Sequence, residues 1–322
     1  MTLHNPWARA AALLCLAAAA HAAPPSVTAG CPQPRDAQSF DAAFTAATVQ
    51  RHSLQQLTCA AAMSFAAAGR AAADPDMQIL ALDAQMNLLE AVQQQLDTQV
   101  YQGGDAYEDL KARWALGVRQ GKLLSQRLAK PAQQEPSIAG IRIAFDLVSV
   151  SSSLVPPDVA YRNAAQAFKP LGELLQKNPQ LLDGVGEHML GRLYFQLPET
   201  SGGDLDKAAT HLVRAQQIAK KNIEFIRWAA ESLVALDRKA EAREMLARLL
   251  PIQPEPIQRQ RLADELRAGI GLAQRSGDEA LASELNAKRA ALFKAFPELQ
   301  TRQSGAVMGH GGVDPMTGKP AD

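Results

Sequence analysis

Apolar side chains recur along most of the chain at steps of three and four residues, which is the spacing of one face of an α-helix. One clear run contains Met77, Leu80, Ala84 and Leu88, and Asp76 stands before it as a residue that caps helix N-termini. The same spacing predicts helices over residues 39–72, 76–103, 105–128, 158–175 and 256–296, the first whole or broken and the last broken at 276–278. The pattern therefore predicts an all-α fold.

One stretch, residues 138–150, fits two kinds of element. Ile141, Ile143 and Phe145 alternate as in a strand, whereas Ile138, Ile141 and Phe145 step as in a helix. The rest of the sequence offers no strand to pair with it, and an unpaired strand would leave backbone groups without hydrogen bonds. We therefore expect a helix here.

The last third of the chain repeats a pattern of small and large apolar residues. Ala208 and Ala242 stand 34 positions apart, as do Leu212 and Leu246. This is the period of tetratricopeptide units, each of which is a pair of antiparallel helices. The residues that carry the pattern are Leu190, Gly191, Tyr194, Ala208, Leu212 and Ala215 in the first unit, and Ala230, Leu233, Ala242, Leu246 and Pro254 in the second.

The first unit contains extra residues between its two helices. Tyr194 and Leu233 are 39 positions apart, which exceeds the 34-residue period by five. The Pro and Gly content of the intervening stretch predicts that the insertion is a loop. Its marker residues are Leu197, Pro198, Gly202 and Gly203.

A single helical hairpin cannot bury its own apolar face, so such units are stable only when neighbours stack. We expect antiparallel hairpins stacked as an irregular tetratricopeptide-like solenoid or bundle over residues 136–299, behind an N-terminal helical region over 23–135. The Gly- and Pro-rich stretch 300–322 is expected to be a disordered tail.

Residues 1–22 have the order of a secretory signal peptide. Arg9 precedes an apolar run from Ala10 to Ala20, and a small residue, Ala22, closes the segment. We expect cleavage after Ala22 and a mature protein in the periplasm. Lys plus Arg and Asp plus Glu number 33 each, so no net charge favours nucleic acid as a partner.

Two cysteines remain once the signal peptide, which contains Cys15, is removed. In an oxidising compartment the pair Cys31 and Cys59 favours a disulfide. Two alternatives stay open: both thiols are free, or Cys31 ends a degraded lipobox that begins at Thr28 and carries a lipid anchor. One sulfur cannot be both lipidated and disulfide-bonded, and lipidation of Cys31 is the one route to the membrane that we expect.

The sequence contains no Gly-x-Ser-x-Gly, no Cys-x-x-Cys in the exported chain and no His pair at metal-binding spacing. We therefore expect no catalytic residue, cofactor or metal. The first helix of each tetratricopeptide hairpin lines the concave side, and its exposed flank predicts a groove for a partner protein or a carboxylate-bearing ligand. The groove residues are His188, Arg192, Phe195, Arg227 and Glu231. An ordinary solvated helix face with one ladder of salt bridges is the alternative.

The stretch from Leu190 to Leu212 contains Leu-Gly-x-x-Tyr, then Leu-Pro, then Gly-Gly-Asp. In these motifs it resembles the periplasmic T-component (TatT) family of TRAP transporters. The resemblance is specific over 181–250, and the lipobox common in that family is degraded here. It implies an all-helical helper of a tripartite uptake system that docks on a solute-binding subunit and holds a small hydrophobic solute.

These features together favour a non-enzymatic periplasmic binding protein, an accessory component of a tripartite solute uptake system. One alternative is a general envelope scaffold with tetratricopeptide units and no role in transport. Another is a hydrolytic enzyme whose site forms only in the folded chain. The sequence leaves the oligomeric state open, a homo-oligomer included.

Overall fold

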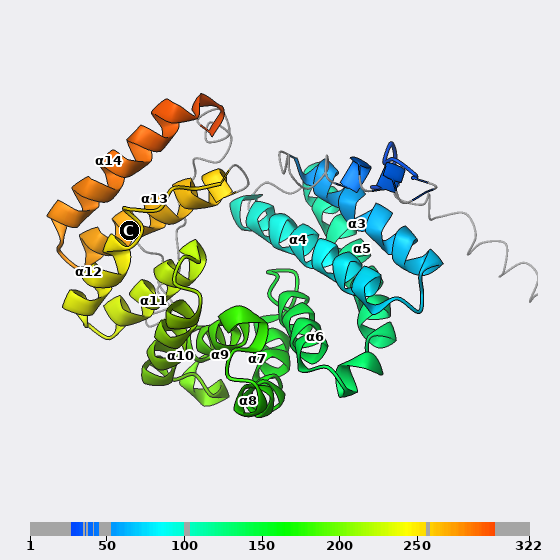
Figure 1. Cartoon of the computed structure of the whole chain (residues 1–322), viewed down its shortest axis with the longest axis horizontal. Helices are drawn as coiled ribbons and strands as arrows, with labels where there is room; N and C mark the ends of the chain where they lie inside the picture. The colour runs from blue at the N-terminus through cyan, green and yellow to red at the C-terminus, as the bar shows by residue number, and fades with distance from the viewer. Residues whose placement is uncertain are drawn as a thin grey trace, which may run out of the picture.

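The computed structural model describes residues 27–34, 36, 38–40, 42–44, 53–99, 104–255 and 258–299. Helices are the regular elements of these ranges, and the expected all-α fold is confirmed. The α-helices are α3 (Leu54–Arg70), α4 (Pro75–Gln99), α5 (Gly104–Arg127), α6 (Pro136–Val148), α7 (Pro157–Ala165), α8 (Phe168–Lys177), α9 (Val185–Gln196), α10 (Leu205–Ile218), α11 (Ile223–Ala235), α12 (Lys239–Ala247), α13 (Arg259–Arg275) and α14 (Glu279–Ala295). Their ribbon curves through α6 to α9 and returns, so that α13 comes toward α4 (Figure 1).

The N-terminal unit packs α3, α4 and α5 side by side. Leu89 from α4 and Trp114 from α5 belong to its core, together with Phe145 from α6. Other residues of α6, among them Leu147, pack against the core formed around α8 and α9. The domain boundary was expected between residues 135 and 136. The helix that follows it, α6, packs into the cores on both sides of that boundary.

The ambiguous stretch 138–150 is helical, as α6 covers Pro136–Val148. Ile138 and Phe145, seven positions apart, are both buried, because two turns of helix return a side chain to the same face. Pro136 stands in the first turn, where its missing N–H removes no helical hydrogen bond. The strand interpretation is wrong.

The helix predicted over 158–175 is instead two helices, α7 and α8, with a break at Gln166 and Ala167. Pro170 explains the break, because it lacks an N–H to donate to the carbonyl of Gln166 and its ring would clash with that carbonyl. The apolar spacing continues across the break, so periodicity alone did not reveal it.

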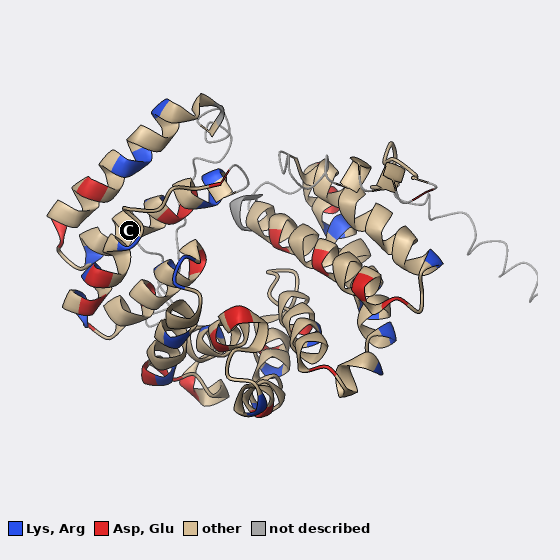
Figure 2. Cartoon of the chain, in the orientation of Figure 1, with Lys and Arg blue, Asp and Glu red and all other residues tan. Residues whose placement is uncertain are grey.

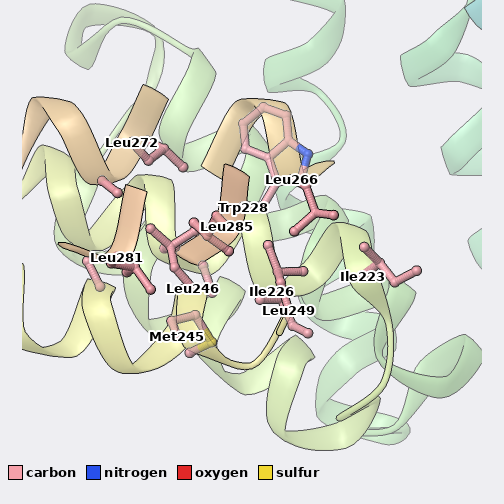
Figure 3. Close-up of a cluster of buried hydrophobic side chains, with 14 of the residues drawn as sticks. Ile223, Ile226, Trp228, Met245, Leu246, Leu249, Leu266, Leu272, Leu281 and Leu285 are labelled. Atoms are coloured by element: carbon pink, nitrogen blue, oxygen red, sulfur yellow. The ribbon is translucent and has the colours of Figure 1, made fainter. Parts of the chain in front are cut away.

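The last part of the chain folds as three consecutive hairpins, α9–α10, α11–α12 and α13–α14. Their shared core includes Trp228, Leu246, Leu266 and Leu285, which meet from four different helices (Figure 3). The repeat residues are buried here, apart from Tyr194 and Pro254, which are partly buried. Each hairpin thus covers the apolar side of its neighbour, as the 34-residue pattern requires.

Gly191 sets the separation of α9 and α10. A Cβ at this position would lie 2.6 Å from Cγ of Leu212. This distance is well inside van der Waals contact, so Leu212 occupies the space that a side chain on α9 would need.

The insertion between α9 and α10 is an ordered loop with the short helix η3 (Glu199–Ser201). A Cβ at Gly203 would lie 1.8 Å from the carbonyl oxygen of Leu197, and Gly202 has a φ of 98°, so both positions favour glycine. The backbone N–H of Asp204 then donates to the carbonyl of Tyr194 at 2.9 Å. This bond ties the end of the loop back to α9.

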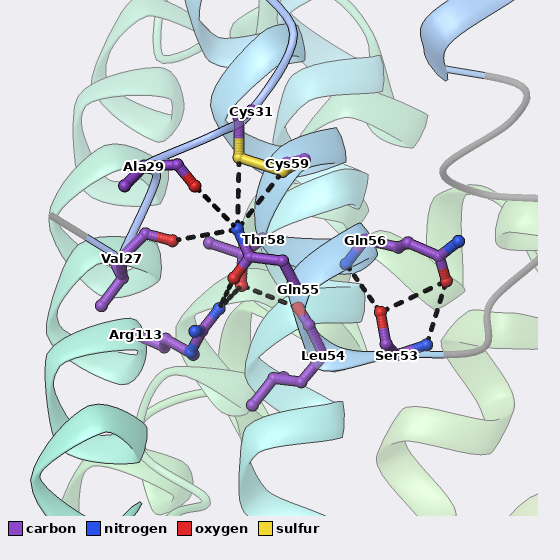
Figure 4. Close-up of a disulfide and its surroundings, with 10 residues drawn as sticks. All are labelled: Val27, Ala29, Cys31, Ser53, Leu54, Gln55, Gln56, Thr58, Cys59 and Arg113. Atoms are coloured by element: carbon purple, nitrogen blue, oxygen red, sulfur yellow. Dashed lines mark hydrogen bonds between the residues drawn. A yellow bond between two sulfur atoms is a disulfide. The ribbon is translucent and has the colours of Figure 1, made fainter. Parts of the chain in front are cut away.

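Cys31 and Cys59 form a disulfide, which fixes the segment at residues 27–34 against α3. The Gln55 amide lies beside it and donates to the carbonyl of Ala29 at 3.4 Å, while Arg113 of α5 donates to the Gln55 side-chain oxygen at 2.9 Å (Figure 4). In this form the Cys31 sulfur is not free for a lipid. The first segment is thereby linked through α3 to α5.

The expected signal peptide at 1–22 and the expected tail at 300–322 lie outside the described residues. Among the helices that the structure describes, none combines the length and the apolar character needed to cross a membrane.

Replacing Gly191 with Ala is expected to destabilise the protein by about 1–3 kcal/mol, because the new methyl group overlaps Leu212. Thermal unfolding followed by circular dichroism measures the effect. Gly172→Ala on α8 is the matched control: its Cβ would meet nothing within 4 Å, and the gain in helix propensity predicts up to about 1 kcal/mol of stabilisation. Equal effects of the two changes would contradict close packing at Gly191.

Replacing both Cys31 and Cys59 with Ser is expected to lower the free energy of unfolding by about 2–4 kcal/mol, since the disulfide closes a loop with a separation of 28 residues. Urea denaturation of the oxidised protein and the double variant measures the difference. Adding a reductant should move the wild type to the midpoint of the variant and leave the variant where it is. If the reductant does not shift the midpoint of the wild type, the disulfide is contradicted.

Candidate functional site

The first helices of the three hairpins, α9, α11 and α13, contribute ionisable side chains to one surface, here called the inner face. His188 of α9 has its Nε2 3.5 Å from a carboxylate oxygen of Glu224 on α11. The other oxygen of Glu224 lies 3.3 Å from Arg261 on α13. Glu224 therefore connects all three helices.

Arg227 makes a second set of links within the inner face. Its Nε donates to Glu265 of α13 at 2.8 Å, and its Nη1 forms an ion pair with Glu231 one turn further along α11. The positive charge of Arg227 is thus neutralised by two carboxylates. Two of the predicted groove residues, Arg227 and Glu231, form the salt-bridge ladder that was the alternative to a groove.

Trp228 is the aromatic centre of this surface and is itself buried. The guanidinium groups of Arg227 and Arg192 lie over its ring at 4.0 Å and 4.7 Å from the centroid. Phe195 meets the same ring edge-on at 5.9 Å. Phe195 was expected to need a covering group, and Trp228 provides it.

His188 was expected on an exposed flank, but its side chain is buried, with 5% of its surface exposed. The imidazole stacks on Phe225 with the ring centroids 4.5 Å apart, which explains why it turns inward. Nδ1 has no hydrogen-bond partner among the described residues, and the contact of Nε2 with Glu224 at 3.5 Å is too poorly aligned to count as a hydrogen bond. Desolvation lowers the pKa of His188, and the charges of Arg192 and Arg227 lower it further against the opposing effect of Glu224.

Glu224 behaves in the opposite sense. Burial disfavours its ionisation, but His188, Arg261 and Arg192 outweigh this and hold the pKa of Glu224 well below its usual range. Near neutral pH the pair is therefore a neutral imidazole beside a carboxylate.

A further carboxylate, Glu90 of α4, belongs to the N-terminal unit. It is close enough for the charges of Glu224, Arg192 and Arg261 to affect its ionisation. The Glu90 side chain is exposed, yet the surrounding protein raises its pKa, first by desolvation and then through the charge of Glu224. Acidic positions recur along α4, as the red segments of its ribbon show (Figure 2).

Sequence reasoning missed Glu90 because it placed the groove within the repeats alone. Asp76, Asp83 and Glu90 are spaced seven residues apart and so share one face of α4. That spacing was a usable signal, but only the fold shows that the charges of Glu224 and Arg192 act on Glu90.

Arg192 differs from the other charged groups of the inner face. It is partly buried, and burial lowers its pKa. Its Nε is buried without a hydrogen-bond partner, and no carboxylate of the described residues lies within 4.0 Å of its guanidinium. Arg192 is therefore a cation held over Trp228 with no anion of the described residues in contact.

Another polar cluster lies in the seam between α9 and α10. Glu187 is 2% exposed and accepts from His211 at 2.6 Å, and its second oxygen lies 3.1 Å from Nε of Arg214. Each oxygen of the buried carboxylate has a cationic or hydrogen-bonding partner from α10. This cluster joins the two helices of the first hairpin.

The protein is expected to lose stability as the pH falls from 7.5 to 5.5, in part through His188. Its folded pKa lies below its unfolded value of about 6.5, so the unfolded chain binds the proton more readily in this window. The contribution of His188 is complete above pH 6.5 and is lost below it. Urea denaturation at several pH values measures the slope.

His188→Phe keeps the stacking on Phe225 and removes the titrating group. This variant should show a smaller loss of unfolding free energy across the same window, while Glu224 and the arginines stay in place. Identical slopes for the variant and the wild type would contradict a buried, neutral His188.

Comparison with known proteins finds a repeat family in the middle of this region. Residues 200–266 match the family model described as Tetratricopeptide repeat, and this stretch runs from η3 through α10, α11 and α12 into α13. No curated protein sequence matches the chain. The chain is thus an all-α protein that contains tetratricopeptide repeats, modules whose stacked hairpins form extended binding surfaces for other proteins.

Proposed function

We propose that this chain is a non-enzymatic periplasmic protein that binds a protein partner along the inner face of its repeats. The observation that carries the proposal is Arg192, a cation positioned over Trp228 without a contacting anion among the described residues. Holding an uncompensated charge in a partly buried place is unfavourable for the free protein. A binding role explains this arrangement, because a partner can supply an anion that contacts Arg192.

The finer proposal is that the partner belongs to a tripartite solute uptake system. It is supported by the resemblance of residues 190–212 to the T-component family and by the ordered loop with Leu197, Gly202 and Gly203. The favoured partner is then a periplasmic solute-binding subunit.

A non-catalytic role is supported by how the ionisable groups are used. Arg227, Glu265 and Glu231 pair with one another, and Glu224 pairs with Arg261, so these charges link helices. A general envelope scaffold would use the same surface, and the identity of the partner separates it from a transport helper.

A photo-cross-linking residue at position 261, on the inner face of α13, is expected to capture a solute-binding subunit in the host. Arg261 is half exposed, so the probe is accessible from the inner face. The matched control is the same residue at position 244, exposed on the outer helix α12. Captured proteins are identified by mass spectrometry.

Capture of cell-wall assembly proteins from position 261 would overturn the transport proposal and favour the scaffold. Equal capture from positions 261 and 244 would show that the inner face is not the binding surface. If no partner is captured, and the purified protein converts small substrates into products, the enzyme alternative is favoured.

A further inference from the structure

The first described residues form a strap along one side of α3, made of residues 27–34, 36, 38–40 and 42–44. Near the start of α3, the Gln55 amide donates to the carbonyls of Val27 and Ala29 at 3.5 Å and 3.4 Å. At the other end of this helix, Arg70 donates to the carbonyl of Pro34 at 3.3 Å. The disulfide joins the strap to α3 between these two points (Figure 4).

Beneath the strap lies an apolar face of α3 that is separate from the main core of the N-terminal unit. Ala60, Met63 and Ala67 follow one another at steps of three and four residues, so they share one stripe of the helix, and all three are buried. Phe40 of the strap belongs to the same cluster and is 4% exposed. Ala61, on the neighbouring stripe, belongs instead to the core with α4 and α5. The strap therefore covers a side of α3 that turns away from that core.

The noncovalent contacts of the strap are weak. Its hydrogen bonds with Gln55 and Arg70 measure 3.3 to 3.5 Å, and bonds at this long end of the range add little net stability. Phe40 is the one described residue of the strap that is fully buried. Ordering every residue of such a segment costs conformational entropy. The bond between Cys31 and Cys59 therefore provides most of the attachment.

The rest of the N-terminal unit is held without the strap. Gln85 of α4 donates to the carbonyl of Ala61 at 2.9 Å in buried surroundings. Arg113 of α5 donates to the hydroxyl of Thr58 at 2.6 Å. These bonds and the core on that side of α3 join the three helices to one another, so release of the strap leaves them packed.

We propose that the disulfide is a redox lock on the strap. While Cys31 and Cys59 are joined, the apolar face of α3 is covered. When the bond is reduced, the strap leaves α3 and uncovers that face, and α3, α4, α5 and the three hairpins stay folded. The inference goes beyond the proposed function, because this face belongs to the N-terminal unit and not to the inner face of the repeats.

The reductant is a dithiol, which reacts by thiol–disulfide exchange. One of its thiolates attacks Sγ of Cys31, the more exposed of the two residues, since Cys59 is 8% exposed. The bond between the cysteines breaks, Cys59 leaves as a thiolate that takes up a proton, and a mixed disulfide forms on Cys31. The second thiolate of the reductant then closes the reductant's own disulfide and releases Cys31. The protein gains two electrons and two protons, and the dithiol is oxidised.

Oxidative footprinting of buried methionines tests the lock. Met63 beneath the strap is 3% exposed, and Met245 in the repeats, 5% exposed, is the matched internal control. The purified protein is reduced with dithiothreitol, separated from it without oxygen, and pulsed with hydroxyl radicals beside the oxidised protein. Reduction is expected to raise the labelling of Met63 by about fivefold or more and to leave Met245 unchanged, because only the strap opens.

Two results would overturn the inference. Unchanged labelling of Met63 would mean that the strap stays in place without the bond. Equal increases at Met63 and Met245 would mean that the disulfide holds the whole fold and not the strap alone.

Variants separate the disulfide from the hydrogen bonds around it. The double variant Cys31→Ser with Cys59→Ser should label Met63 like the reduced wild type, with or without dithiothreitol. Gln55→Ala removes the Gln55 hydrogen bonds and keeps the disulfide, so oxidised Gln55→Ala should protect Met63 as the oxidised wild type does. Strong labelling of Met63 in oxidised Gln55→Ala would assign the attachment to Gln55 and contradict the proposal.

Discussion

The inner face depends on how closely α9 approaches α10. Leu212 fills the space where a side chain at position 191 would lie, so glycine at this position allows the two helices to pack with a narrow seam. Fully buried Ala208 and Ala215 continue the small side of that seam on α10. Because α10 packs on one side of α9, the opposite flank of α9 belongs to the inner face. The following hairpins repeat this arrangement. The surface that carries Arg192 is therefore a consequence of packing between small and large residues.

The charged groups of the inner face fall into two sets. One set forms ion pairs that link the helices, and the other has no contacting partner among the described residues. Arg227 and Glu265 join α11 to α13, and Glu224 connects to both α9 and α13. Such links fix the relative position of the hairpins at a desolvation cost that good geometry offsets. Arg192 and Glu90 stay outside this network.

The sequence predicted what local periodicity controls. The helical class, the 34-residue register, the insertion loop and the pairing of Cys31 with Cys59 are all present in the structure. It did not predict the break between α7 and α8, because apolar spacing continues across Pro170 while the hydrogen-bond ladder does not. It also placed His188 at the surface, since stacking on Phe225 is a contact between distant helices. Glu90 was missed for the same reason: the fold, and not the local pattern, decides what faces it.

The central claim is that the inner helices of the repeats form the binding surface for a protein partner. Hydrogen–deuterium exchange on the purified protein, with and without its captured partner, tests this directly. The account predicts added protection in α9, α11 and α13, and unchanged exchange in the outer helices α10, α12 and α14. Added protection of the outer helices, or no added protection of the inner ones, would contradict it.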